Sequence, residues 1–468
     1  MFSIFIYTLE IAILSTLLAA VIGIPMAFFT ARRRFLGRQL ILSAAAIPLC
    51  VPPLVVALGY VSFWGMNGAV GKFLQLKFSF LYSTAGIIIA QGFYNFPFVT
   101  KIVSDSWEKL PAEQSNAAKL LGASEKRVFF TITLKQLSGA IAAACIPVFL
   151  FCFFSFMIVL LFAPAGHSTL EVELYHSVRS TLNVKNGMWI ALLETLTAIF
   201  VVIIYTLIVR KNQVNATGVD YVPNYKKNIR HELWAFLPLA VLIILFFACP
   251  LISVLICGLP KFFELIKLSS FWKAVWNSLW VGVCTGILCT VISFVYAVLV
   301  RLNKKQGSAV LQTIPFIPMA ISSVVISWLA TLIFHQGNAV LLIILQTLLY
   351  WPIAYRQIQN GVNKIADETN NAAIMLSKNK FDVVWRIYLP SCKYVIKSAF
   401  AFCFAISLGD STIPLMLSIR NFNTLALYTY KLAASYRFSQ ACMCGGLVAI
   451  LSIIIFSFVN IQNKRGNK

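Results

Sequence analysis

Charged residues are scarce in this sequence. Only 11% of its 468 residues are charged, whereas a soluble globular domain has about 25%. Hydrophobic residues make up 60% of the chain, and the mean hydropathy is +0.84. This composition excludes a water-soluble globular protein, because too few charged side chains are present to cover a surface exposed to water.

Two further absences exclude classes of chemistry. The four histidines, His167, His176, His231 and His335, form no cluster of the kind that a metal site or membrane enzyme needs. The chain also lacks the phosphate-binding pattern G-x4-G-K-[ST], so it cannot hydrolyse ATP by itself. Most of the 11 cysteines lie in apolar segments, where cysteine behaves as a small hydrophobic residue. We therefore predict no catalytic residue, no metal site and no cofactor.

Apolar blocks of about 20 residues, each bounded by charge, recur along the chain. A helix of this length crosses the roughly 30 Å of hydrocarbon in a bilayer. Lipid cannot hydrogen-bond to backbone N–H and C=O groups, so such segments span the membrane as helices. The sequence therefore predicts an all-α membrane protein with about eleven transmembrane helices. The expected spans are 3–29, 39–61, 80–103, 138–163, 187–209, 234–257, 274–299, 308–334, 339–358, 392–415 and 441–461.

The excess of positive charge, +23 overall, follows this topology. If the Arg32-Arg33-Arg34 end of the first span is cytoplasmic, alternation places 28 of the 38 Lys and Arg residues on the cytoplasmic side. The positive-inside rule then predicts an inner-membrane protein with its N-terminus outside and its C-terminus in the cytoplasm. The charge therefore indicates a membrane-lipid environment and no nucleic-acid partner.

An internal repeat sets the domain organisation. One constant offset in numbering aligns Gln91 with Gln346, and the same register continues as far as Tyr175 and Tyr430. We predict a first half at 1–209 with about five spans, a cytoplasmic linker at 210–232, and a second half at 233–468 with about six. Both copies run in the same direction, which predicts parallel repeats with a pathway between them. The span at 234–257 has no counterpart in the first half, through true loss or a misplaced start.

Each half contains one long amphipathic cytoplasmic stretch, at 107–137 and 361–393. Apolar residues recur at helical spacing among charged ones, as at Leu120 and Leu121. Such a segment is too polar to insert and too apolar for a free linker. We expect two short helices with a turn, available to a cytoplasmic partner. An ordinary amphipathic helix at the membrane interface is the alternative.

Each stretch carries similar residue types at the same spacing. The first copy has Asn116, Ala117, Ala118, Gly122, Ile132 and Leu134. The second copy has Asn371, Ala372, Ala373, Ser377, Ile387, Leu389 and Pro390. This spacing resembles the coupling loop of ABC importer permeases, whose pattern is E-A-A-x3-G-x9-I-x-L-P. The resemblance implies the fold of a type I ABC importer permease and two copies of a separate cytoplasmic ABC ATPase subunit.

The two copies depart from the family pattern in different ways. Both have Asn in place of Glu, and the first copy has Lys135 where the pattern ends in proline. The second copy has Ser377 in place of glycine. Glycine accepts a left-handed turn freely, whereas serine there costs about 1 kcal/mol or more. We therefore expect the second loop to turn differently.

The far side of the second half carries Ser407-Leu408-Gly409-Asp410, Thr424-Leu425 and Tyr430, and that of the first half carries Ser155-Phe156, Thr169-Leu170 and Tyr175. These residues resemble the fused permeases of thiamine importers, and iron(III) importer permeases share the layout. This resemblance implies a solute taken from a periplasmic or lipid-anchored binding protein, with thiamine or a thiamine phosphate as the first candidate and iron(III) as the alternative. The residues expected at the pathway or its outer gate are Ser155, Tyr175, Asp410 and Tyr430.

Simpler roles remain open for these residues. Asp410 is equally explained as a helix-end carboxylate bonded to neighbouring backbone, and interfacial tyrosines commonly anchor a protein in the membrane. Glu10 and Glu194 lie inside spans, where a carboxylate costs roughly 2.5–3.5 kcal/mol, and we expect each to pair with neighbouring helices. A secondary transporter and a membrane enzyme are the alternative functional classes.

Overall fold

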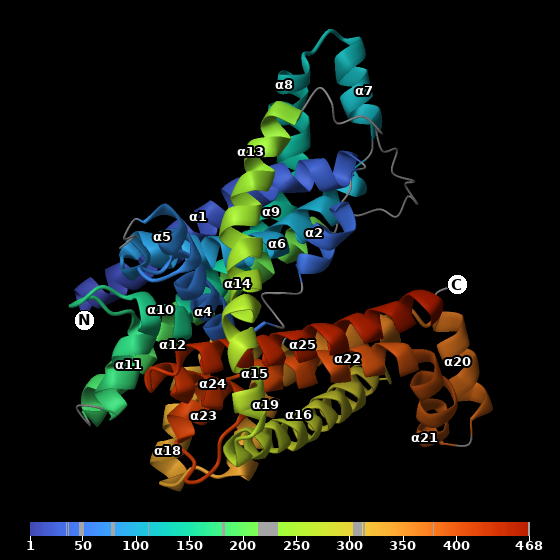
Figure 1. Cartoon of the computed structure of the whole chain (residues 1–468). Helices are drawn as coiled ribbons and strands as arrows, with labels where there is room; N and C mark the ends of the chain where they lie inside the picture. The colour runs from blue at the N-terminus through green and yellow to red at the C-terminus, as the bar shows by residue number, and fades with distance from the viewer. Residues whose placement is uncertain are drawn as a thin grey trace. The chain divides into compact units, whose positions relative to one another are not determined.

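The computed structural model describes residues 1–33, 35, 37–45, 51–75, 80–110, 112–179, 183–213, 233–302, 311, 314–377 and 379–466. Within these ranges the chain is built from helices and contains no β-strand (Figure 1). The prediction of an all-α protein is therefore confirmed.

Nine helices in the described part of the chain are long and apolar enough to cross a membrane, against about eleven predicted. Two expected spans account for the difference. The span expected at 80–103 is a single helix, α6 (Thr84–Glu108), but it is less apolar than the nine helices counted as spans. The span expected at 308–334 is broken, because a 3-10 segment with an internal proline (Ile314–Ala320) leaves only the 12-residue α18 (Ser323–Phe334).

The helices form two compact units. Unit 1 consists of Met1–Leu49 and Val56–Val254, and unit 2 consists of Cys50–Val55 and Leu255–Lys468. The halves 1–209 and 233–468 stay a sequence-based prediction, and residues 214–232 of the expected linker lie outside the described residues.

Nine of the described helices of the first repeat have counterparts in the same order in the second. The helices of the first repeat are α1 (Phe2–Arg32), α2 (Arg38–Ala44), α4 (Pro53–Trp64), α5 (Ala69–Leu74), α6, α7 (Ala112–Leu120), α8 (Glu125–Val128), α9 (Leu134–Phe153), α10 (Met157–Phe162), α11 (Leu170–Arg179) and α12 (Val184–Gln213). Helices α13 (Leu233–Ile243) and α14 (Cys249–Gly258) follow. The second repeat contains α15 (Phe262–Ile266), α16 (Ser269–Leu302), α18, α19 (Ala339–Asn363), α20 (Asp367–Leu376), α21 (Lys380–Val383), α22 (Leu389–Gly409), α23 (Thr412–Leu417), α24 (Leu425–Ala434) and α25 (Phe438–Gly466). Helices α1, α4 and α6 to α12 correspond to α16, α18 and α19 to α25.

The repeat extends beyond the segment aligned in the sequence. Helices α1 and α4 correspond to α16 and α18 at one offset in numbering, which pairs Pro53 with Ser323. From α6 and α19 onwards the offset is smaller and pairs Thr84 with Ala339. The offset changes because residues 65–83, which contain α5, are replaced by the much shorter connection 335–338. The longer connection hid the relation between the first helices of the two repeats.

A duplicated hydrogen bond supports this correspondence. The backbone N–H of Leu170 donates to Thr8 Oγ1 at 3.0 Å, and the N–H of Leu425 donates to Ser278 Oγ at 2.6 Å. Thr8 and Ser278 correspond at the larger offset, and the two leucines at the smaller one. The same contact between the same two helices therefore occurs in both units, which confirms the internal repeat.

The core of each unit is a group of three long helices. Helices α1, α6 and α9 pack together in unit 1, and α16, α19 and α22 pack together in unit 2. Small residues allow close approach: a Cβ on Gly23 of α1 would lie 2.8 Å from Val99 Cβ of α6. This packing fixes both ends of the helices on which the candidate residues lie.

Candidate functional site

The predicted cytoplasmic stretch of unit 1 folds as a helical hairpin, here called the first hairpin (residues 112–133). Helix α7 ends in a turn at Gly122, whose φ of 84° is in the left-handed region. The turn is closed by the N–H of Ala123 donating to the Ala118 carbonyl at 3.0 Å, which is a common helix ending. Ser124 then caps α8 by accepting from the Arg127 N–H. Glycine is needed here because its missing Cβ makes the turn strain-free.

The second hairpin (residues 367–388) has the same parts but a different turn. Ser377 ends α20 in an extended conformation, with φ −89° and ψ 139°. The prediction that serine changes this turn is confirmed, since a side chain disfavours the left-handed region that Gly122 adopts.

Each hairpin returns to the membrane helices through one turn of π-helix. These turns span Phe129–Thr133 before α9 and Val384–Tyr388 before α22. They lie at corresponding positions of the two repeats. A π turn inserts an extra residue into the helix and is frequently found at functional sites.

The two hairpins expose matching pairs of large apolar side chains. Leu120 and Leu121 are each 89% exposed, and Met375 and Leu376 are each 88% exposed. The pairs correspond in the same register that aligns Gln91 with Gln346. Isolated exposed apolar residues are ordinary, but a duplicated pair at the end of a projecting helix indicates a contact surface. The sequence pattern identified the first pair, and the second was missed.

The other predicted residues surround these pairs. On the first hairpin Asn116, Ala117 and Gly122 are exposed, while Ala118 is half-buried. On the second hairpin Ala372 is exposed and Ala373 is buried. The apolar residues where each hairpin ends and the next helix begins are half-buried: Ile132, Leu134, Ile387 and Leu389. Pro390 is the second residue of α22. Asn371 lies within α20. The structure therefore divides the motif into an exposed helix and a partly buried base.

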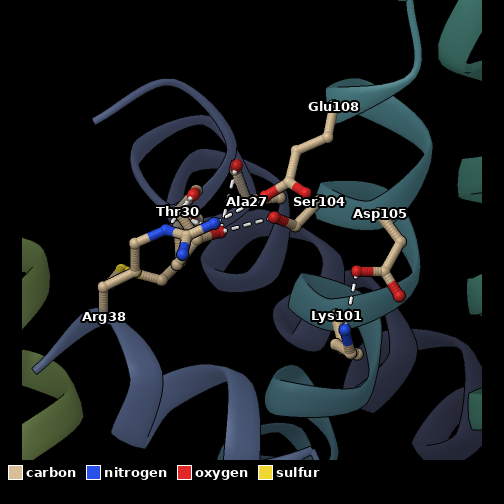
Figure 2. A network of polar contacts seen from close by, with 8 residues as sticks. Ala27, Thr30, Arg38, Lys101, Ser104, Asp105 and Glu108 are labelled. Atoms are coloured by element: carbon tan, nitrogen blue, oxygen red, sulfur yellow. Dashed lines mark hydrogen bonds and ion pairs between the residues drawn. The ribbon is translucent and has the colours of Figure 1, made fainter. Parts of the chain in front are cut away.

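A polar network joins α1, α2 and α6 next to the first hairpin (Figure 2). Arg38 of α2 donates through Nε to the Thr30 carbonyl at 2.6 Å and pairs with Glu108, at the end of α6, at 2.6 Å. The Thr30 hydroxyl in turn donates to Ser104 Oγ at 3.0 Å. The arginine thus ties the ends of α1 and α6 together just before the hairpin begins.

Asp410 lies at the opposite end of α22 from the second hairpin. Its Oδ1 accepts from the N–H groups of Thr412 and Ile413 at 2.9 and 3.3 Å. Its Oδ2 accepts from Gln346 Nε2 at 3.1 Å. This geometry agrees with the alternative of a helix-end carboxylate bonded to neighbouring backbone, here at the start of α23. A role for Asp410 in the pathway stays a prediction.

Gln346 joins three helices of unit 2, a role that the sequence did not reveal. Its Oε1 accepts from Thr285 of α16 at 3.2 Å and from Ser407 of α22 at 2.6 Å, while Gln346 itself belongs to α19. The counterpart Gln91 is 1% exposed, and neither polar atom of its side chain has a partner among the described residues. The repeat had aligned the two glutamines, but only the structure separates their roles.

The remaining predicted residues lie near the ends of the core helices. Ser155 follows α9 at the position corresponding to Asp410, and is half-buried. The ring of Tyr175 on α11 lies 5.3 Å from that of Phe156, and Tyr430 is half-buried on α24. Burial lowers the pKa of the Arg179 guanidinium, and the nearby Tyr175 acts in the opposite direction. The structure therefore places the two tyrosines at corresponding positions, without deciding between a pathway and an interface anchor.

The sequence profile of a protein family matches the chain twice. The family is described as "Binding-protein-dependent transport system inner membrane component", and the matches cover residues 19–213 and 301–467. The chain belongs to this family. It is the membrane-spanning permease subunit of an ABC importer, with one match in each repeat. This assignment is to binding-protein-dependent transport and not to the alternative of a secondary transporter.

Two thiamine permeases are similar to this permease over nearly its whole length, and a molybdenum permease over a shorter segment. The "Thiamine transport system permease protein ThiP" of Salmonella typhimurium is 25% identical, covering 96% of this chain and 86% of the relative. The protein of the same name from Escherichia coli is 24% identical with the same coverage. The "Molybdenum transport system permease protein ModB" of Haemophilus influenzae is 36% identical over 29% of this chain and 60% of the relative.

A solved structure is similar to half of the permease. It is a bacterial ABC transporter involved in the import of the acidic polysaccharide alginate. The match has 17% identity and a TM-score of 0.42, and covers 51% of this chain and 98% of that chain.

Proposed function

We propose that this permease imports thiamine or a thiamine phosphate, driven by two copies of a cytoplasmic ABC ATPase subunit. The observation that supports the ATPase contact is the duplicated apolar pair at the end of α7 and α20. Each pair is nearly fully exposed, and its burial in a partner cleft would remove apolar surface from water. One ATPase copy would bind each hairpin.

The proposed cargo rests on the relatives. Similarity to thiamine permeases extends over 96% of the chain, which is more than a shared core would require. Thiamine is a cation with aromatic rings, so carboxylates and aromatic residues are the chemistry that would recognise it. Glu10 is exposed on α1 within a span, rather than enclosed among neighbouring helices as expected. A carboxylate on that surface would favour a cationic solute.

The binding protein and the orientation complete the proposal. A periplasmic or lipid-anchored binding protein would deliver the solute on the outer side, where the N-terminus is predicted to lie. The hairpins would then lie in the cytoplasm, as the positive-inside rule requires. ATP binding would draw the two ATPase subunits together and move the hairpins, and hydrolysis would reset the inward-facing state. The permease itself forms no covalent intermediate in this cycle.

The test is ligand-stimulated ATP hydrolysis by the reconstituted complex of permease, ATPase and binding protein. We expect stimulation by thiamine and none by ferric iron or molybdate. Stimulation by iron alone would contradict the cargo and leave the importer assignment in place. Failure of any ATPase subunit to associate with the permease would contradict the role of the hairpins.

A further inference from the structure

Arg301 lies at the junction between a membrane helix and the second hairpin. It is the second-last residue of α16, and its side chain is only 14% exposed. The guanidinium donates to the Ile365 carbonyl at 3.0 Å and forms an ion pair with Asp367, the first residue of α20. The guanidinium also lies beside the Tyr388 hydroxyl. Arg301 therefore touches the hairpin at its beginning and at its end.

The chemistry of arginine suits this double contact. A guanidinium carries five N–H donors in a rigid plane and stays charged at any physiological pH, so one side chain can serve several acceptors at once. Tyr388 is fully buried in the π turn that leads into α22. The contact thus joins three segments: the end of α16, the start of α20 and the start of α22.

Apolar packing surrounds the same junction. One hydrophobic cluster includes Ala297 and Val298 of α16, Ala373 of α20, and Val383 and Tyr388 at the return of the hairpin. All five are at most 8% exposed. The second hairpin is therefore packed against α16 by its base, while its tip remains exposed.

The three corresponding positions of unit 1 cannot form the same contact. At the positions corresponding to Arg301, Asp367 and Tyr388 it has Ala31, Ala112 and Thr133. None of these three can form an ion pair. In unit 1, Arg38 of α2 pairs with Glu108 on α6, ahead of the hairpin (Figure 2).

We propose that Arg301 is a positioning residue that fixes the second hairpin to α16, so that a movement of the hairpin is transmitted to that membrane helix. The two hairpins then differ in their attachment. The second is bonded directly to α16 through Arg301, whereas the Arg38 ion pair of unit 1 is made to α6, the helix before the first hairpin. The role in transport rests on the proposed function of the hairpins as ATPase contacts. The attachment itself does not.

The first test measures the attachment in the permease alone. Deuterium exchange is compared between the wild type, Arg301→Gln and Arg301→Lys in lipid nanodiscs. Hydrogen bonds to charged groups are strong enough that their loss should accelerate amide exchange in residues 367–376 on the order of tenfold. Exchange in residues 112–120 of the first hairpin should stay unchanged. Arg301→Lys keeps the charge but loses the planar set of donors. Its exchange rate in residues 367–376 should therefore lie between those of the wild type and Arg301→Gln.

The second test measures transport in the full complex with ATPase and binding protein. Arg301→Gln should keep ATPase binding and ATP turnover, while the number of solute molecules moved per ATP falls severalfold. Arg386→Gln is the matched control, because Arg386 pairs with Asp382 within the same hairpin and is 81% exposed. This control should change neither exchange nor the transport ratio.

Unchanged exchange at residues 367–376 in Arg301→Gln would overturn the proposal, as would an equal effect of Arg386→Gln. If the hairpin loosens but the transport ratio stays the same, the attachment is structural and the mechanical role is wrong. If wild-type permease binds no ATPase, the proposed function fails while the exchange result still decides the attachment. Should Arg301→Gln fail to fold, Asp367→Asn removes the ion pair from the exposed partner and must show the same local loosening.

Discussion

The exposed apolar pair of the first hairpin offers a quantitative test of ATPase docking. Leu120 and Leu121 are each 89% exposed, so almost the whole of both side chains is available for burial by a partner. Full burial of one leucine side chain contributes about 1.5–3 kcal/mol. Replacing both with serine should therefore weaken ATPase binding by at least about 3 kcal/mol, or about 100-fold in Kd.

The assay is titration of the purified ATPase onto nanodisc-embedded permease, followed by light scattering or interferometry. The double variant should fold normally, because substitutions at exposed positions usually change stability by no more than about 0.5 kcal/mol. Phe73→Ser is the control, since Phe73 is 86% exposed but lies on the connection between α4 and α6, away from the hairpins. An unchanged Kd in the leucine variant, or an equal loss in Phe73→Ser, would refute the reasoning.

Three further predictions concern the polar residues and the turns. Gln346→Leu should lower the free energy of unfolding by about 2–4 kcal/mol, because it breaks three hydrogen bonds, two of them buried, whereas Gln91→Leu should change it little. Unfolding in mixed detergents measures both variants, and equal losses would contradict the difference between the units. Asp410→Asn should retain solute uptake, since an amide oxygen still accepts from the backbone, while Asp410→Ala should reduce uptake. Loss of uptake in the asparagine variant alone would instead show a need for the charge. Gly122→Ala should destabilise the first hairpin by about 1–2 kcal/mol, because residue 122 has a positive φ, while Ser377→Gly should have a smaller effect on the second hairpin. Local deuterium exchange measures both effects, and the reverse order would contradict the assigned turns.

The membrane class and the repeat were predictable because both depend on patterns that a single sequence displays. Apolar blocks of membrane length decide the class, and the register from Gln91 to Tyr175 reveals the duplication. The correspondence of α1 with α16 was not visible, since the longer connection between α4 and α6 in unit 1 changes the offset between the repeats. The hydrogen bonds of Leu170 and Leu425 recover that relation through geometry.

The hairpins were predictable in outline, but their attachment was not. Spacing and a family resemblance located both motifs, and the chemistry of serine correctly predicted a different turn at Ser377. The contact of Arg301 with Asp367 joins residues 66 positions apart on different helices. Nothing in local composition distinguishes this arginine from the other basic residues near the ends of spans, so only the fold could identify it.

Asp410 shows the limit of arguing from a rare charge. An acidic residue at the end of a span indicates either a functional carboxylate or a structural cap, and the sequence favoured neither. The structure supplies its partners: two backbone N–H groups at the start of α23 and the side chain of Gln346. These bonds give Asp410 a structural task that any transport role would have to accommodate.

The most direct measurement is ATP-dependent uptake of labelled thiamine into proteoliposomes that contain the permease, two ATPase copies per permease and the binding protein. We predict uptake that requires ATP, the binding protein and intact apolar pairs on both hairpins. Uptake that persists without the ATPase subunit would contradict the central claim that this membrane protein is driven through its two hairpins.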